Sequence, residues 1–256
     1  MTYSFHTDEF ELAYTESQND QSVLWENHCH AKFEMIAVLE GDVNVLLEGR
    51  RYRLKENQTI ILPPLCYHSI SVNEGAIYRR VTALFDLAAI PSVLHPKFIK
   101  DEADVSISFF SRIEELKKIC QKGDTAFYAP LAKSLMVELL YESIKSTADP
   151  SEVKTDEFLQ TTVLYIEQNL HKKILLDDLA RLTSRSKSSF CHLFEEKMKI
   201  SPKQYILQKK LALASKLISE GTPPTVAAIR IGYENYSDFY RLYRKHYQSN
   251  PAKKQD

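Results

Sequence analysis

Three histidines and one glutamate fall within two short stretches of the N-terminal part of the sequence. His28, His30 and Glu34 lie in "HCHAKFE", and His68 ends "PPLCYH". The first three share parity, so on an uninterrupted strand their side chains would point to one face. Imidazole and carboxylate ligands suit Fe, Mn, Ni or Zn, so the four could hold a divalent metal. They could also line a pocket for a polar small molecule, or be structural histidines that hydrogen-bond inside the fold.

A second chemically interesting set lies near the C-terminus, in "GYENYSDFYRLYRKHY", residues 232–247. Asn235 is suited to cap a helix that begins at the next residue. On a helical period, one face carries the expected core residues Phe239, Leu242, Tyr243 and His246. The opposite face carries Tyr236, Ser237, Tyr240, Arg241 and Arg244. Arginine can bond a guanine edge with two hydrogen bonds, and hydroxyl groups reach bases or phosphates, so this face predicts contact with duplex DNA. A solvated amphipathic helix is the alternative from this stretch taken by itself.

A related unit precedes this helix. The stretch "ILLDDLARLTSRSKSSFCHLFEEKM" reads as helix, turn and helix, with Ser186 capping the second helix. The residues expected to face outward are Lys187, Ser188, Cys191 and His192. The same order recurs in "PTVAAIRIGYENYSDFYRLYRK", and "SPKQYILQKKLALASKLISEG" reads as the helix that joins the two units. Two such units could present two helices to successive major grooves, about 34 Å apart.

Charge and composition limit the partners. The net charge is −1, but residues 157–256 hold 17 Lys and Arg against 10 Asp and Glu, whereas residues 1–156 hold 16 against 24. This division favours a polyanion as partner of the C-terminal part only. The first 25 residues lack the pattern of a signal peptide, and no apolar run approaches a membrane span. The four separated cysteines read as free thiols, so a cytoplasmic protein without membrane contact is expected.

The hydrophobic pattern divides the chain into four parts. Short alternating runs before residue 86 predict a small β-barrel, with a hairpin at "EGRR" and a strand that ends at Pro63-Pro64. Two amphipathic helices are then expected, at residues 107–121 and 129–144. The predicted domains are a barrel at 1–105, a helical pair at 106–147, a linker at 148–157 and an all-α domain at 158–256. The pair could form a dimer contact through residues such as Leu116 and Leu139, or could cover the barrel.

Residues from about 166 to 251 resemble the DNA-binding domain of AraC/XylS-type transcription regulators. The resemblance is carried by "LDDLA", "SFCHLF", "ISPKQYI", "AAIRIGY" and "DFYRLYRK". It implies that Ser188, Cys191 and His192 face bases in the first unit, and that Tyr236, Ser237, Tyr240 and Arg241 do so in the second. It also implies a homodimer, contact with RNA polymerase, and activation of transcription. Ser184 and Lys199 stand where the family has glycine, and Glu195-Glu196 stand where it often has lysines.

The N-terminal stretches resemble the cupin signature, in which HxH and Glu are followed by Gly41, Pro63 and His68. Leu65 stands where the second cupin motif favours glycine. The barrels of AraC-type regulators commonly bind an effector without metal, so His28, His30, Glu34, His68 and, nearby, Trp25 are interpreted as lining an effector pocket. No cofactor is expected, and a metal is not favoured. Buried hydrogen-bonding groups favour a sugar or polyol as the effector.

The sequence therefore predicts a DNA-binding transcription regulator controlled by a small molecule in an N-terminal barrel. Two alternatives belong to other classes. One is a metal-dependent cupin enzyme with an appended helical domain, and the other is a module whose Tyr- and Arg-rich helix binds another protein. The sequence lacks the GxGxxG, P-loop, GxSxG and HExxH motifs, so catalysis is not expected.

Overall fold

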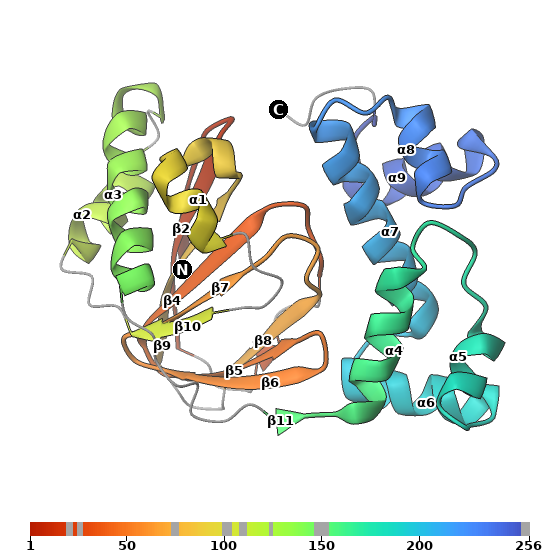
Figure 1. Ribbon diagram of the computed structural model, residues 1–256. Helices are drawn as coiled ribbons and strands as arrows, with labels where there is room; N and C mark the ends of the chain where they lie inside the picture. The colour runs from red at the N-terminus through yellow and green to blue at the C-terminus, as the bar shows by residue number, and fades with distance from the viewer. Residues whose placement is uncertain are drawn as a thin grey trace.

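The structure is a computed structural model that describes residues 1–18, 23–24, 28–72, 77–98, 104–107, 112–122, 125–145 and 154–251. Its N-terminal half is built on two antiparallel sheets, and its C-terminal half is helical (Figure 1). This confirms the predicted class, a cupin-like β-barrel with helices followed by an all-α domain.

The first sheet has six strands in the order β1-β2-β9-β4-β7-β10, and the second has five in the order β11-β6-β5-β8-β3. The strands are β1 (Thr2–His6), β2 (Phe10–Gln18), β3 (Val23–Leu24), β4 (Phe33–Glu40), β5 (Asp42–Leu47), β6 (Arg50–Lys55), β7 (Gln58–Leu62), β8 (His68–Val72), β9 (Ile77–Phe85), β10 (Asp104–Ile107) and β11 (Lys154–Thr155). The predicted hairpin is confirmed, because β5 and β6 pair up to Leu47 and Arg50 around the two-residue turn Glu48-Gly49.

The central strand β4 of the six-stranded sheet is buried on both faces. Alternate residues of β4, such as Ile36 and Val38, face the second sheet and pack with Val45 of β5 and Ile70 of β8. The intervening residues, such as Met35, pack against the helices outside the sheet. Alternation along the strand thus directs one set of apolar side chains to each of two cores.

The helices outside this sheet are the short 3-10 helices η1 (Leu87–Ala89) and η2 (Ser92–Leu94), then α1 (His95–Phe98), α2 (Ile113–Cys120) and α3 (Thr125–Lys145). The predicted helical pair exists, but its first helix begins later than expected, because Ile107 belongs to β10. Leu116 of α2 and Leu139 of α3 are fully buried against the barrel. These two residues therefore cover the barrel, which was one of the two alternatives, and are not available to a second chain.

The C-terminal domain contains α4 (Glu157–Gln168), α5 (Leu176–Leu182), α6 (Lys187–Met198), α7 (Pro202–Ser219), α8 (Pro224–Arg230) and α9 (Tyr236–Tyr247). The predicted caps are confirmed, since the Ser186 and Asn235 side chains accept hydrogen bonds from the backbone at the starts of α6 and α9. Within the predicted linker, Lys154–Thr155 forms β11 and pairs with β6, and residues 148–153 lie outside the described residues. Figure 1 shows α4 and α7 on the side of this domain that is nearest the barrel.

Candidate nucleic-acid interface and the polar cluster of the barrel

The first helix-turn-helix unit consists of α5 and α6. Phe190 and Phe194 are fully buried in the domain core, which leaves the other side of α6 toward solvent. Lys187, Ser188 and His192 are exposed there, as predicted. The Lys187 ammonium lies 3.0 Å from the Asp177 carboxylate of α5, so this lysine is partly neutralised by its own unit.

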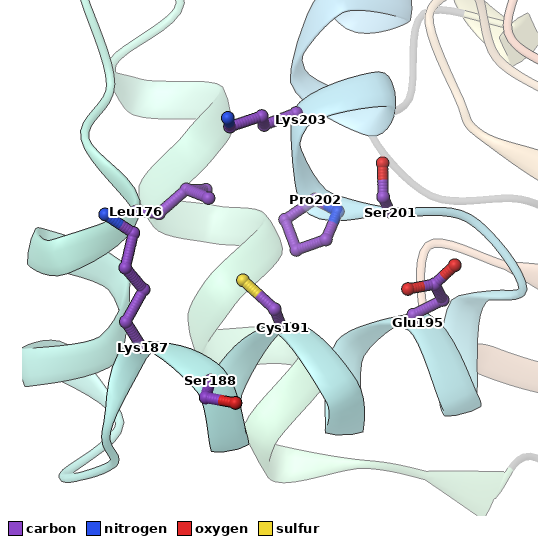
Figure 2. A pocket seen from close by; sticks show the side chains of 8 residues that line it. All are labelled: Leu176, Lys187, Ser188, Cys191, Glu195, Ser201, Pro202 and Lys203. Carbon is purple, nitrogen blue, oxygen red and sulfur yellow. The ribbon is translucent and has the colours of Figure 1, made fainter.

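Cys191 differs from its exposed neighbours, because it is half-buried at a hollow of about 500 Å³ on the outer side of α6. Figure 2 shows its side chain directed into the space between α6 and Pro202 at the start of α7. Lys203 and Glu195 also line this hollow. The predicted base-facing surface of the first unit is therefore concave, mainly apolar at Cys191 and of mixed charge around it.

The second unit presents α9. Phe239 and Tyr243 are buried, and Tyr243 packs on Tyr247 with ring centroids 4.7 Å apart. The expectation that His246 faces the core was wrong: His246 is exposed, and Tyr247 lies partly buried in its place. The bulkier aromatic ring is stabilised more by burial than an imidazole is, so the apolar face is shifted by one residue.

The prediction for the outward side of α9 is confirmed in part. Ser237, Arg241 and Arg244 are exposed, whereas Tyr240 is half-buried and Tyr236 packs against the core of the domain. The Arg244 guanidinium lies over the Tyr240 ring, 5.9 Å from its centroid. The Arg241 side chain is 78% exposed and donates a hydrogen bond to Asp238 over 2.9 Å. Such an exposed pair is weak, so Arg241 can exchange Asp238 for a base or a phosphate at little cost.

The two units are joined by more than α7. Lys210 of α7 is buried, and its ammonium donates hydrogen bonds to the carbonyl oxygens of Lys172, between α4 and α5, and of Ile231, at the end of α8. Burial lowers the pKa of Lys210 to about 8. Gly232 lies against Lys172 with φ +79°, where a Cβ atom would come within 2.8 Å of the Lys172 Cα. The turn of the second unit is therefore in direct backbone contact with the first unit, a contact that the sequence did not predict.

In the barrel, the structure brings His28, His30, Glu34 and His68 together, with one ligand atom from each lying within 4.8 Å of the others. The uninterrupted strand assumed from parity is absent, because β4 begins at Phe33. Instead, His28 and His68 pair through their backbones, with N–O distances of 3.1 and 3.0 Å. The Glu34 carboxylate oxygen Oε2 lies 3.0 Å from the His30 Nε2 and 2.8 Å from the His68 Nε2. Trp25, the fifth predicted lining residue, lies outside the described residues.

In His30 and His68, the ring nitrogen that faces away from Glu34 is hydrogen-bonded to a backbone carbonyl. The Nδ1 of His30 donates to the Lys32 carbonyl and the Nδ1 of His68 to the Cys66 carbonyl, each over 2.9 Å. Because carbonyl oxygens only accept, a neutral ring in either position presents its Nε2 lone pair to Glu34. The buried Nε2 of His68 makes no aligned hydrogen bond. Two lone pairs facing one carboxylate repel, so the cluster requires either protonated rings or a cation among them.

The electrostatics agree with that requirement. Burial disfavours the charged form of both Glu34 and His68. The close His30 and His68 rings nevertheless hold the pKa of Glu34 well below its usual range, and Glu34 in turn raises the pKa of His68. Imidazoles whose Nδ1 atoms donate to carbonyls, together with a carboxylate, are also the arrangement of metal-binding histidines. The residues of the cluster therefore fit a divalent transition metal.

Comparison with known proteins decides the family. The family model for the AraC-like ligand binding domain matches residues 9–140, and the model for a helix-turn-helix domain matches residues 179–256. The chain belongs to the AraC family. Its N-terminal part is an AraC-like ligand-binding domain and its C-terminal part is a helix-turn-helix domain.

This AraC-family protein is similar to several transcriptional regulators, and the share of each chain that aligns differs among them. It is 23% identical over 232 residues to the uncharacterized HTH-type transcriptional regulator YobQ of Bacillus subtilis (strain 168), covering 87% of this chain and 85% of YobQ. It is 37% identical over 92 residues to the probable transcriptional regulator LumQ of Photobacterium leiognathi, covering 36% and 37%. It is 27% identical over 133 residues to the XylDLEGF operon transcriptional activator of Pseudomonas putida, covering 49% and 39%. The chain thus spans well under half the length of LumQ and of the XylDLEGF activator. Among the described residues, no helix is long and apolar enough to span a membrane.

Proposed function

We propose that this AraC-family protein activates transcription from a duplex operator that α6 and α9 contact together, under the control of a small molecule bound at His28, His30, Glu34 and His68. The observation that carries the DNA-binding part is the pair of capped helices, each with an exposed polar side. The two units are held together by Lys210 of α7 and by the contact of Gly232 with Lys172. The similarity to the XylDLEGF operon transcriptional activator supports activation. RNA polymerase is then a partner at the promoter.

The two units contribute unequally in this proposal. In the first unit, Glu195 and Glu196 are exposed beside Ser188, Cys191 and His192, and two carboxylates repel phosphate. In the second, Tyr236, Ser237, Tyr240, Arg241 and Arg244 provide hydroxyls and two guanidinium groups. We therefore expect α9 to provide more of the affinity.

Selection of duplexes from a random pool by the full chain tests this function and gives the operator. Arg241→Ala should then weaken binding to the selected duplex by about 1–3 kcal/mol and relax preference at one position. Lys216→Ala, which changes a half-buried basic residue of α7 and leaves α6 and α9 unaltered, is the control. Failure to enrich any duplex at moderate salt would refute the DNA-binding part, and unchanged binding by Arg241→Ala would refute the ranking of the units.

For the effector, we favour a sugar or polyol. Neighbouring hydroxyl groups can donate to the Glu34 carboxylate and accept from protonated imidazoles, and a ligand that lacks them would leave buried groups unpaired. A thermal-shift screen of sugars and polyols on the full chain tests this class. Glu34→Gln should abolish any stabilisation, whereas Glu40→Gln, on the same strand but paired with Arg79, should preserve it. Equal stabilisation of both variants would place the ligand elsewhere.

A divalent metal is the second candidate for the same four residues, favoured by the carbonyl-bound Nδ1 atoms of His30 and His68. Such a metal would supply a positive charge between the rings and Glu34, and could itself bind effector oxygens. Calorimetric titration with Zn²⁺ and Mn²⁺, together with metal analysis of the purified chain, tests this candidate. Glu34→Gln should lose the site and Glu40→Gln should keep it. Equal metal content in the two variants would exclude the site.

We also propose a homodimer that uses the outward side of α3, because its other side is buried against the barrel. Phe127, Leu131 and Tyr141 follow one side of α3 and are 75%, 37% and 49% exposed. Phe127→Glu should shift the chain toward the monomer in sedimentation experiments. Val93→Glu changes an apolar residue that is 80% exposed outside α3 and should leave the association unchanged. A monomeric wild-type chain at high concentration would contradict the dimer.

A further inference from the structure

The barrel touches the DNA-binding domain through the turn of its β5–β6 hairpin. Glu48 has φ +46°, and its carboxylate accepts hydrogen bonds from the Tyr205 hydroxyl and, over 2.6 Å, from the Lys209 ammonium, both on α7. The adjacent Gly49 lies so close to α4 that a Cβ atom would come within 2.6 Å of the Leu159 Cβ. We call Glu48, Tyr205 and Lys209 the clasp.

Lys209 is the centre of the clasp. Its side chain is 2% exposed, and its ammonium also donates to the Leu65 carbonyl over 2.6 Å and to Glu167 of α4 over 2.8 Å. Burial opposes its charge, but Glu48 and Glu167, together with the other nearby groups, outweigh burial and raise the pKa of Lys209. A buried ion pair of this kind is strongly destabilised when one partner is removed, since the other charge stays buried without compensation.

Residues 65–68 connect the clasp to the polar cluster. The Leu65 amide donates to the His30 carbonyl over 2.8 Å, while the carbonyl of the same residue accepts from Lys209. The Tyr67 amide donates to Glu48 over 2.7 Å, and the Tyr67 ring packs on Tyr205 with centroids 5.0 Å apart. His68, the next residue, is a member of the cluster. Each end of this segment is thus bonded to the cluster on one side and to α7 on the other.

We propose that occupancy of the polar cluster is relayed to the DNA-binding domain through residues 65–68 and the clasp. This inference rests on the proposed function in one respect: it takes the cluster as the effector site. A ligand regulates only through its differential affinity for two arrangements. Here residues 65–68 include His68 of the cluster and are bonded to His30, and the same residues contact Glu48 and α7 through Leu65 and Tyr67. We expect a change in the position of His30 or His68 to change the hydrogen bonds that Leu65 and Tyr67 make.

The test is amide hydrogen exchange of the full chain without DNA, with Glu34→Gln as the perturbation of the cluster. Exchange in residues 205–211 of α7 should become about tenfold faster in Glu34→Gln and remain unchanged in the control Glu40→Gln. Tyr205→Phe keeps the ring but removes the hydroxyl that binds Glu48. In that background α7 already exchanges faster, and Glu34→Gln should add less than about twofold, because coupled changes are not additive.

A milder change guards against misfolding of Glu34→Gln. His28→Ala alters the exposed member of the cluster and leaves the buried Glu34 and the clasp in place. The relay is overturned if cluster variants leave exchange in residues 205–211 unchanged, or if they accelerate it equally with and without an intact clasp. Selection of duplexes by the wild-type chain tests DNA binding and does not depend on the exchange experiment. The relay can therefore be refuted while the proposed DNA-binding function stands.

Discussion

Replacing Gly232 with alanine should separate the two helix-turn-helix units. Gly232 follows α8 with φ +79°, and an added Cβ would meet the Lys172 Cα at 2.8 Å, the Lys172 carbonyl carbon at 2.9 Å and the His171 oxygen at 3.0 Å. All three atoms belong to backbone, which cannot rotate away as the end of a side chain can. Either the second unit must move or the loop between α4 and α5 must move.

The loss of stability in Gly232→Ala can be estimated by comparison with Gly221, a second glycine with positive φ. Gly221, at the end of α7, has φ +93°, and a Cβ there would meet no atom within 4 Å. Gly221→Ala therefore costs only the left-handed backbone, about 1–2 kcal/mol. Gly232→Ala has the same backbone cost and adds about 1–3 kcal/mol for displaced packing. We expect it to destabilise the domain by about 2–5 kcal/mol in total.

Urea unfolding of the full chain, followed by circular dichroism, measures the difference between the two variants. Operator binding gives a second readout, because a tilt of α9 relative to α6 prevents both helices from entering their grooves together. Gly232→Ala should therefore lose operator affinity under conditions in which it is still folded, whereas Gly221→Ala should retain it. Equal destabilisation of both variants, with equal operator affinity, would refute the contact between the units.

Three further predictions concern the C-terminal domain. Asp156 caps α4 and pairs with Lys197. Burial opposes its charge, but Lys197 and the backbone amides of Leu159 and Phe158 together outweigh burial and lower the pKa of Asp156 from 3.8. Because the folded pKa is depressed, its stabilisation is present above pH 3.8 and lost as the pH falls further, so wild type and Asp156→Asn should differ in melting temperature at pH 6, and this difference should shrink as the pH falls below 3.8. Arg244→Ala should reduce the slope of log affinity against log salt by about 1, measured by fluorescence anisotropy, and an unchanged slope would mean that Arg244 contacts no phosphate. Lys199, which ends α6 with φ +58°, should accept glycine with a gain of about 1 kcal/mol in urea unfolding, and a loss would show that its side chain stabilises the fold.

The sequence predicted those features that depend on neighbours along the chain. Alternation located the strands, "EGRR" located the hairpin, and Ser186 and Asn235 marked the starts of α6 and α9. The four members of the polar cluster were also predicted, because their residue types and spacing fit a known signature.

The predictions failed or were silent where contacts between distant segments decide the structure. Lys154–Thr155 looked like linker, but forms a strand because β6 offers an open edge to pair with. Ile107 continued a helical pattern, yet it pairs with Gln58 of β7. The burial of Lys209 and Lys210 was not predicted, since burial of a lysine depends on carbonyl and carboxylate partners that no local pattern reveals.

These two adjacent lysines give α7 two separate tasks. Lys209 is bonded to the barrel through Glu48, and Lys210 is bonded to the loop of the first unit and to the end of α8. Successive residues of a helix cannot move independently, because their backbone is fixed by the same turn. We expect a displacement of α7 that separates Lys209 from Glu48 also to disturb the hydrogen bonds of Lys210 to the carbonyls of Lys172 and Ile231. These hydrogen bonds connect the first unit, which carries α6, to the second unit, which carries α9. In this proposal, a displacement at Lys209 alters the spacing of α6 and α9 through α7 itself.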